Sequence, residues 1–216
     1  MITIIDYDIG NLRNVQKAFE FNKAEARITN RFDEIDRATA LVLPGVGHFH
    51  HGMENLEKTG MDKLICKKVL EDGIPILGIC LGMQLLSKTG YENGERPGLG
   101  LLEMETKSMQ VTSSEIRIPH MGWNSVEIAD EARLFRGIPN FTDFYFVHSC
   151  AVQTSRSDIV SSRCSYGQDF VSSVEIGNIY ATQFHPEKSQ MFGLQIINNF
   201  VDIANESNNI IQHEVS

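Results

Sequence analysis

The first half of the chain alternates short runs of apolar and β-branched residues with longer segments in which apolar residues recur every three or four positions. The short runs predict buried strands, and the helical spacing predicts amphipathic helices. The predicted strands cover residues 3–6, 24–29, 40–43 and 74–79, and the predicted helices cover residues 11–21 and 61–71 and resume at residue 81. Strands and helices in this order predict a parallel sheet with helices on both faces.

The second half of the chain has a different pattern of apolar and polar residues. From about residue 98 onward, short apolar stretches follow one another with only turns between them, which predicts an additional region of antiparallel strands. These strands cover residues 104–111, 115–118, 124–128, 144–147, 159–163, 170–175 and 178–182, before a last helix at 192–204. We therefore expect one α/β domain over residues 1–205, with an open, mostly parallel sheet flanked by helices, and a polar C-terminal tail over residues 206–216.

The composition is that of an ordinary globular protein, since 42% of the 216 residues are hydrophobic and 22% are charged. A formal net charge of −9 makes nucleic acid and anionic membranes unfavourable partners. The first residues lack the positive charge and long apolar stretch of a signal peptide, and no apolar run approaches the roughly 20 residues of a membrane span. We therefore expect a cytoplasmic protein that contacts neither nucleic acid nor membrane.

Metal-binding patterns are weak. No spacing typical of a zinc site or a disulfide framework relates the four cysteines, which are Cys66, Cys80, Cys150 and Cys164. Three histidines lie close together at His48, His50 and His51, but metal ligands need a defined spacing and supporting hydrogen bonds. We expect a solvated loop at these histidines, and neither a metal nor another cofactor.

The sequence Gly78-Ile79-Cys80-Leu81-Gly82 follows the apolar run at 74–77 and has the form of a nucleophile elbow, with cysteine in the central position. A strand that turns sharply into a helix strains its central residue, and glycine neighbours allow the tight packing that the turn needs. The start of a helix also favours a thiolate. We therefore expect Cys80 to be a catalytic nucleophile with its thiol exposed at the helix N-terminus.

A cysteine nucleophile needs a base, and the base needs an orienting partner. His185 ends a predicted strand and Glu187 follows two residues later, across Pro186, so the turn can bring the carboxylate back to the imidazole. An oxyanion needs backbone N–H donors, and one would come from Leu81. We expect a second donor from residues 43–47, a glycine-rich loop at the end of the predicted strand 40–43.

At this point the sequence resembles a known family. Residues 78–84 and 184–187 are similar to the class I, or triad, glutamine amidotransferases. Further segments resemble one subfamily, the glutaminase subunits of imidazole glycerol phosphate synthase. These segments are Asp6-Tyr7 with Gly10-Asn11-Leu12, residues 43–47, residues 119–124 (Pro-His-Met-Gly-Trp-Asn), residues 145–149 (Tyr-Phe-Val-His-Ser) and residues 187–189 (Glu-Lys-Ser).

The resemblance implies a flavodoxin-like fold and hydrolysis of L-glutamine through a thioester on Cys80, with His185 and Glu187 completing a triad. It also implies a heterodimer with a HisF-type (βα)8-barrel cyclase, which receives the ammonia in histidine biosynthesis. Further roles carried over by matching positions are an oxyanion hole completed by the backbone of Val46 and Gly47, glutamine binding by Gln84, Glu92 and Ser149, and partner contacts by Asn11, Trp123 and Lys188.

The chain departs from the pattern of the subfamily at several positions outside the triad, notably Asp8, His48, Ser87 and Cys150. These departures leave a second reading open, in which a paralogue supplies ammonia to a HisF-like partner that amidates a bacterial surface sugar. Two other classes are also open: a non-catalytic binding subunit and a stand-alone cysteine hydrolase. The intact triad argues against a non-catalytic chain, and a lone hydrolase does not need the partner-type segments.

Overall fold

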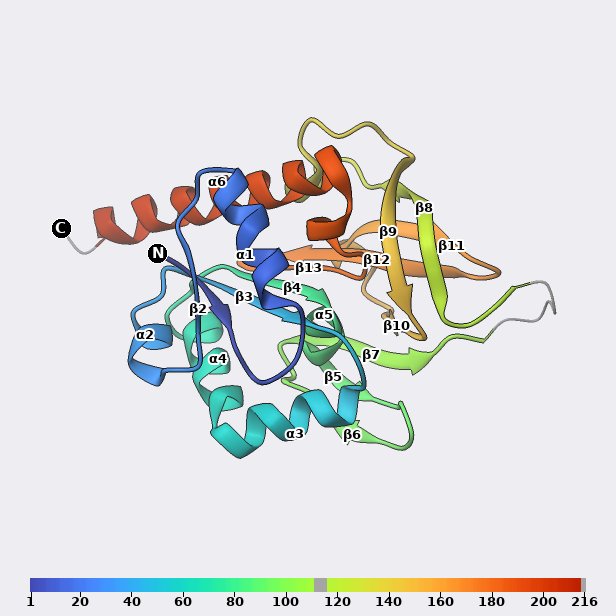
Figure 1. The fold of residues 1–216 in the computed structure, drawn as a ribbon, viewed down its shortest axis with the longest axis horizontal. Helices are drawn as coiled ribbons and strands as arrows, with labels where there is room; N and C mark the ends of the chain where they lie inside the picture. The colour runs from blue at the N-terminus through green and yellow to red at the C-terminus, as the bar shows by residue number, and fades with distance from the viewer. Residues whose placement is uncertain (111–115, 215–216) are drawn as a thin grey trace.

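The computed structural model describes residues 1–110 and 116–214. The described strands form one sheet with helices packed on both faces (Figure 1). The strands are β1 (Ile2–Ile5), β2 (Ala26–Thr29), β3 (Ala40–Gly45), β4 (Ile76–Cys80), β5 (Ser87–Gly90), β6 (Arg96–Pro97), β7 (Leu102–Ser108), β8 (His120–Ile128), β9 (Thr142–His148), β10 (Cys150–Gln153), β11 (Val160–Ser165), β12 (Asp169–Ile176) and β13 (Ile179–Thr182).

The helices are α1 (Leu12–Phe21), α2 (Phe32–Asp36), α3 (Phe49–Thr59), α4 (Met61–Leu70), α5 (Leu81–Leu85) and α6 (Gln190–Glu214). Three single turns of 3-10 helix are η1 (Arg133–Phe135), η2 (Ser157–Ile159) and η3 (Pro186–Lys188). Within the described residues, no helix combines the length and the apolar character that crossing a bilayer requires.

The sheet has a parallel half and a mostly antiparallel half. Strands β2, β1, β3, β4 and β13 lie side by side in that order, and each neighbouring pair is parallel. Strand β13 then pairs antiparallel with β12, which continues through β10 to β7 and also pairs with β11. The hairpin of β8 and β9 extends from β11. This arrangement confirms the predicted α/β class with its added antiparallel region.

Side chains of the parallel strands alternate between two apolar layers. Ile4 and Val42 belong to a core that contains buried residues of α1 and α6, such as Phe19 and Phe200. The neighbouring residues of the same strands, including Leu41, pack instead with buried residues of α3 and α4. Figure 1 shows α1 and α6 on one side of the sheet and α3 and α4 on the other. Because both faces are covered, the strands are apolar throughout, as their sequence indicates.

Several predicted elements differ from the observed ones. The histidines at 48–51 do not form a solvated loop: His48 precedes α3, and His50 and His51 lie in its first turn. The last helix begins at Gln190 and continues to Glu214, so it extends well past the predicted end at 204. Residues 116–118 are not in a strand, while residues 111 and 115 of the predicted strands lie outside the described residues. Strands β5, β6 and β10 and helices α2 and α3 were not predicted.

Two glycines of the elbow, Gly78 and Gly82, lie so close to other backbone atoms that a side chain would overlap them. A Cβ on Gly82 would lie 1.7 Å from the carbonyl oxygen of Leu43, and a Cβ on Gly78 would lie 2.9 Å from the backbone nitrogen of Met83. Gly82 therefore allows α5 to pack closely against β3, and Gly78 allows the chain to turn tightly from β4 back over the first turn of α5.

We predict that Gly82→Ala destabilises the protein by about 3 kcal/mol, because the added methyl group overlaps the Leu43 carbonyl. Gly73→Ala is the matched control: nothing lies within 4 Å of its Cβ position, but its φ of +66° disfavours a side chain, so the expected cost is only about 1 kcal/mol. Urea unfolding of both variants measures the difference. Equal losses of unfolding free energy would show that the contact with Leu43 does not constrain the elbow.

Candidate active site

The predicted nucleophile lies at the junction of β4 and α5. Cys80 has φ 54° and ψ −105°, a conformation that costs energy for a residue with a side chain. This is the strained backbone that the elbow sequence predicts. The prediction of an exposed thiol is wrong, because Cys80 is only 4% exposed. Its Sγ lies 3.8 Å from the carbonyl oxygen of Val147 and 3.6 Å from the amide nitrogen of Gln183.

His185 and Glu187 meet in the turn that joins β13 to α6. Their side chains are almost completely buried, and Nδ1 of His185 lies 2.8 Å from Oε1 of Glu187. A carboxylate only accepts, so Nδ1 carries the proton. The turn is fixed by Ser189, whose hydroxyl donates to the His185 carbonyl at 2.6 Å and accepts from the backbone N–H of Tyr145 at 3.0 Å.

Electrostatics favour the charged form of His185. Burial by itself lowers the pKa of this imidazole, but the negative charge of Cys80 and the hydrogen bond and charge of Glu187 outweigh burial and raise the pKa from 6.5 to about 10. Within the described residues, Nε2 of His185 is buried without a hydrogen-bond partner. The arrangement thus pairs a sulfur with an imidazolium whose second nitrogen is free to exchange a proton.

The predicted oxyanion donors directly follow the ends of two neighbouring strands, β3 and β4. Gly45, the last residue of β3, is paired in register with Cys80, so Val46 and Gly47 leave the sheet beside the thiol. Gly47 has φ +112°, and Val46 is 41% exposed. Leu81 follows Cys80 in the first turn of α5, where backbone N–H groups have no partner inside the helix.

Gln84 and Gln183 form a buried amide pair beside Cys80. The Gln84 amide nitrogen donates to the carbonyl oxygen of Cys150 at 2.9 Å and to Oε1 of Gln183 at 3.1 Å. Gln183 in turn donates to Cys80 Sγ. Sequence reasoning assigned no role to Gln183, although it directly precedes the segment 184–187; a wholly buried polar side chain at that point is the signal that could have found it.

Glu92 anchors the start of α3. Its Oε1 lies 2.8 Å from Nδ1 of His48, and its Oε2 accepts from the backbone N–H of Phe49 at 2.7 Å. Next to it, burial raises the pKa of the Cys150 thiol to about 11, and the charge of Glu92 contributes to that increase. Ser149, which precedes Cys150, is exposed between β9 and β10. The two predicted glutamine-binding residues Glu92 and Ser149 are therefore both neighbours of Cys150, Glu92 through the thiol and Ser149 along the chain.

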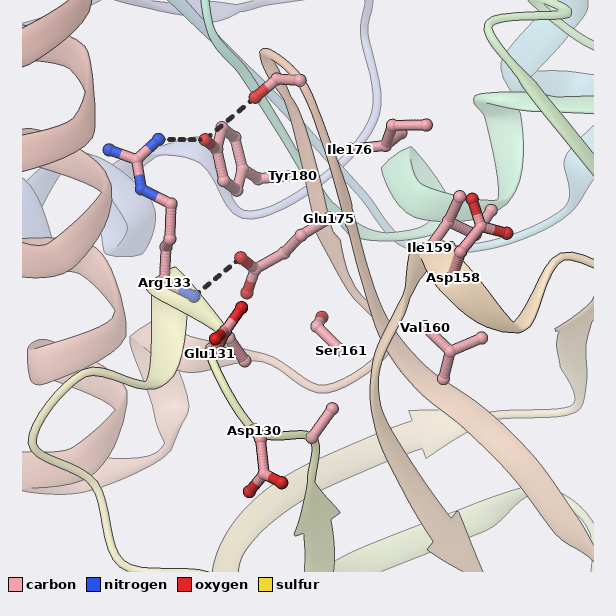
Figure 2. Close-up of a pocket in the computed structure, with 13 residues that line it drawn as sticks. Asp130, Glu131, Arg133, Asp158, Ile159, Val160, Ser161, Glu175, Ile176 and Tyr180 are labelled. Carbon is pink, nitrogen blue, oxygen red and sulfur yellow. Dashed lines mark hydrogen bonds between the residues drawn. The ribbon is translucent and has the colours of Figure 1, made fainter.

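A separate cavity of about 300 Å³ lies near the amino-terminal end of β13 (Figure 2). Arg133 donates from its guanidinium to the Tyr180 hydroxyl and from its backbone N–H to Glu175, as the dashed lines show. Burial raises the pKa of Glu175, although the backbone N–H groups of Arg133 and Leu134, which donate to its carboxylate, oppose the increase. None of the predicted site residues lines this cavity. Tyr180 pairs in register with Leu77, so the cavity lies toward the opposite end of the parallel strands from Cys80.

Comparison with known proteins identifies the family of the chain. The family model of glutamine amidotransferase class I matches residues 3–204. The chain belongs to the class I glutamine amidotransferase family. The chain is 46% identical over 201 residues to imidazole glycerol phosphate synthase subunit HisH 1 of Campylobacter jejuni strain RM1221, covering 93% of this chain and 99% of that protein. It is 43% identical over 208 residues to subunit HisH of Moorella thermoacetica, covering 96% and 97%.

Solved structures share the fold at lower sequence identity. A structure described as part of a GMP synthase from Thermoplasma acidophilum superposes with a TM-score of 0.74 at 20% identity, covering 98% of this chain and 96% of that one. A structure described as a glutamine amidotransferase has a TM-score of 0.72 at 21% identity, covering 95% and 100%. As a class I glutamine amidotransferase, the chain is an enzyme that takes nitrogen from glutamine.

Two of the three predicted partner residues, Trp123 and Lys188, lie close to the ring of Tyr145. The Trp123 and Tyr145 ring centroids are 6.0 Å apart, and Nζ of Lys188 lies 5.7 Å from the Tyr145 centroid. Trp123 is 46% exposed. Asn11 is exposed at the start of α1, where its side chain accepts from the backbone N–H of Asn14 at 3.3 Å, and α1 contacts η3, which carries Lys188.

Three of the departures from the subfamily pattern form local hydrogen bonds. Asp8 has φ 64°, a conformation that favours glycine, and its backbone N–H bonds the Asp6 carboxylate at 3.2 Å. Ser87 forms a buried 3.0 Å hydrogen bond with Thr106. His48 binds Glu92, as described above. None of these residues contacts His185 or Glu187 through a hydrogen bond in the described part of the chain.

We predict that Cys80→Ser lowers the pKa of His185 below its value of about 10, because the serine hydroxyl carries no negative charge. A pH titration of the His185 ring resonances measures this change. Since the folded pKa is raised, the contribution of His185 to stability is complete below pH 6.5 and disappears as the pH rises through about 10. Cys66→Ser, on α4, should leave the titration unchanged. An unaltered His185 titration in Cys80→Ser would contradict the ion pair.

Proposed function

We propose that this protein is the glutaminase subunit of an imidazole glycerol phosphate synthase. It hydrolyses glutamine to glutamate and ammonia, and it passes the ammonia to a HisF-type (βα)8-barrel cyclase in histidine biosynthesis. The observation that carries the proposal is the buried group of Cys80, His185 and Glu187 at the elbow. The names and high coverage of the HisH relatives support the choice of pathway.

In the proposed reaction, Cys80 Sγ attacks the carbon of the glutamine side-chain amide, and the negative charge on the amide oxygen is stabilised by the N–H groups of Leu81 and of the loop at Val46 and Gly47. The carbon–nitrogen bond breaks, and Nε2 of His185 gives its proton to the leaving nitrogen, which departs as ammonia. Water, deprotonated by His185, then hydrolyses the thioester and releases glutamate. Glu187 keeps the imidazole oriented through the 2.8 Å contact to Nδ1.

The binding of glutamine would use the groups around Cys150. The carboxylate of Glu92, now held by His48 and the Phe49 N–H, offers a negative partner for the substrate ammonium. Exposed Ser149 offers a hydroxyl from the neighbouring turn, and Gln84 keeps its amide oxygen as an acceptor, because both of its N–H contacts are already made inside the protein.

The partner surface of the proposal consists of Asn11, Trp123 and Lys188. An exposed tryptophan packed edge-to-face against a tyrosine, with a lysine above the same tyrosine ring, is the kind of aromatic and cationic group that provides much of the energy of an interface. The surface lies next to the site, because the Tyr145 carbonyl accepts from the backbone N–H of His185 at 2.9 Å.

We predict that Cys80→Ala, assayed with the cyclase, lowers glutamine-dependent synthesis by at least about 10³-fold, since no thioester can form. Synthesis from ammonium salts should persist at the wild-type rate, because the cyclase then receives ammonia from solution. Product formation with each nitrogen source is measured in parallel. Loss of both activities would mean that Cys80 maintains the complex rather than attacking glutamine, and Cys66→Ala controls for general thiol loss.

We also predict that the isolated chain hydrolyses glutamine slowly and that the cyclase accelerates it, because the loop at 46–47 must rearrange to present its N–H groups. Glutamate release is measured with and without the cyclase. Fast hydrolysis by the chain alone, unchanged by the cyclase, would favour a stand-alone hydrolase.

Growth of a histidine auxotroph that lacks its own glutaminase subunit distinguishes the histidine pathway from the surface-sugar alternative. Failure of this chain to restore growth, despite an active glutaminase, would exclude the proposed pathway.

A further inference from the structure

Gln183 is a side chain outside the proposed triad that contacts the sulfur of Cys80. It follows the last residue of β13, its side chain is fully buried, and its amide nitrogen lies 3.6 Å from Cys80 Sγ. The proposed triad does not use it. A fully buried amide that is aimed at a reactive sulfur needs an explanation, because burying an amide is costly unless each of its atoms has a partner.

The orientation of the Gln183 amide follows from the hydrogen bonds around it. The carbonyl oxygen of Cys150 can only accept, so Gln84 must turn its NH2 group toward that oxygen. The same NH2 group lies 3.1 Å from Gln183, so the Gln183 atom at that contact is the oxygen. The NH2 group of Gln183 therefore faces Cys80. This assignment does not depend on distinguishing nitrogen from oxygen by shape.

The Cys150 carbonyl is itself held firmly. Nδ1 of His148 lies 2.8 Å from it, and Nε2 of His148 lies 3.0 Å from Nδ1 of His120. Burial lowers the pKa of His148 to about 3 and that of His120 to about 4, so both rings are neutral at physiological pH. His148 therefore donates from Nδ1 to the Cys150 carbonyl and accepts from His120 at Nε2. Two donors, from His148 and Gln84, fix the oxygen that orients the amide pair.

We propose that Gln183 is a further catalytic residue, whose side-chain N–H donates a hydrogen bond to the Cys80 thiolate. The proposal rests on the proposed role of Cys80 as the nucleophile. A neutral amide stabilises the negative sulfur without competing for its proton, which His185 exchanges. The same N–H stabilises the thiolate when the thioester is hydrolysed: the bond between sulfur and carbon breaks, and its electron pair returns to Sγ beside the Gln183 donor.

The test is the pH dependence of Cys80 alkylation by iodoacetamide in the full-length protein. Only the Cys80 peptide is quantified, by mass spectrometry, so that the other cysteines do not contribute. Gln183→Met keeps the length of the side chain and removes the donor. We expect the midpoint of the alkylation profile to move upward by about one pH unit, the size of a charge-assisted hydrogen bond.

Thr182→Val is the matched control. Thr182 is also fully buried, and its hydroxyl donates to the Phe184 carbonyl at 3.0 Å rather than to Cys80. This variant loses a buried hydrogen bond next to Gln183, so it should be destabilised to a similar degree and yet keep the wild-type alkylation midpoint. A midpoint that moves equally in Thr182→Val and Gln183→Met would overturn the proposal, because a general loosening of the strand end would then explain both.

A second measurement uses the wild-type chain and does not depend on the folding of a variant. In ¹⁵N-labelled protein, the side-chain N–H resonance of Gln183 should titrate with the same midpoint as Cys80 alkylation, and it should shift when Cys80 is carbamidomethylated. A resonance insensitive to the state of Cys80 would overturn the role of Gln183.

The outcomes separate the two proposals. If wild-type Cys80 reacts no faster than a cysteine of the unfolded chain, the nucleophile assignment fails, and the role of Gln183 fails with it. If wild-type Cys80 reacts as a thiolate and the Gln183→Met profile superposes on it, only the inference about Gln183 is overturned.

Discussion

The contact between the backbone of Gly82 and the carbonyl of Leu43 constrains the whole site. It sets how closely α5 approaches β3, and with Gly78 it fixes the angle at which β4 turns into α5. Because β3 and β4 are paired with Gly45 opposite Cys80, the loop that leaves β3 must begin beside the sulfur. This arrangement requires a strained backbone at Cys80, and the pairing of β4 with β3 and β13 holds that residue in place.

Strand β13, the last parallel strand, and the antiparallel strand β9 bring the remaining groups to the same point. Thr182 of β13 pairs in register with Ile79 of β4, so the residues that follow β13 emerge next to Cys80. The turn that contains His185 is then tied to β9 through Tyr145 and Ser189. The same strand β9 supplies the Val147 carbonyl near Cys80. The turn after β13, braced by the antiparallel strands, thus carries the base and its orienter, while β4 carries the nucleophile.

The sequence predicted the parts of this arrangement that depend on local constraints. The glycine spacing around Cys80 predicts a close approach of backbone segments, and Pro186 between His185 and Glu187 predicts a fixed turn. Long-range contacts leave weaker signals. Helix α3 was missed because polar residues at 50–51 and Gly52 resemble a loop, whereas Glu92, more than forty positions away, holds its first N–H. The buried state of Cys80 and the contact of Gln183 likewise depend on β9 and α5, whose positions follow only from the folded sheet.

The hold of Glu92 on Phe49 has a geometric consequence for the loop between β3 and α3. Gly45 is fixed at one end by strand pairing, and Phe49 is fixed at the other by a carboxylate. The intervening residues 46–48 form a short bridge between two supports, and Gly47 is the one among them without a Cβ. Any change in the direction of an N–H group must therefore occur by rotation of peptide planes within this bridge, without displacement of its ends.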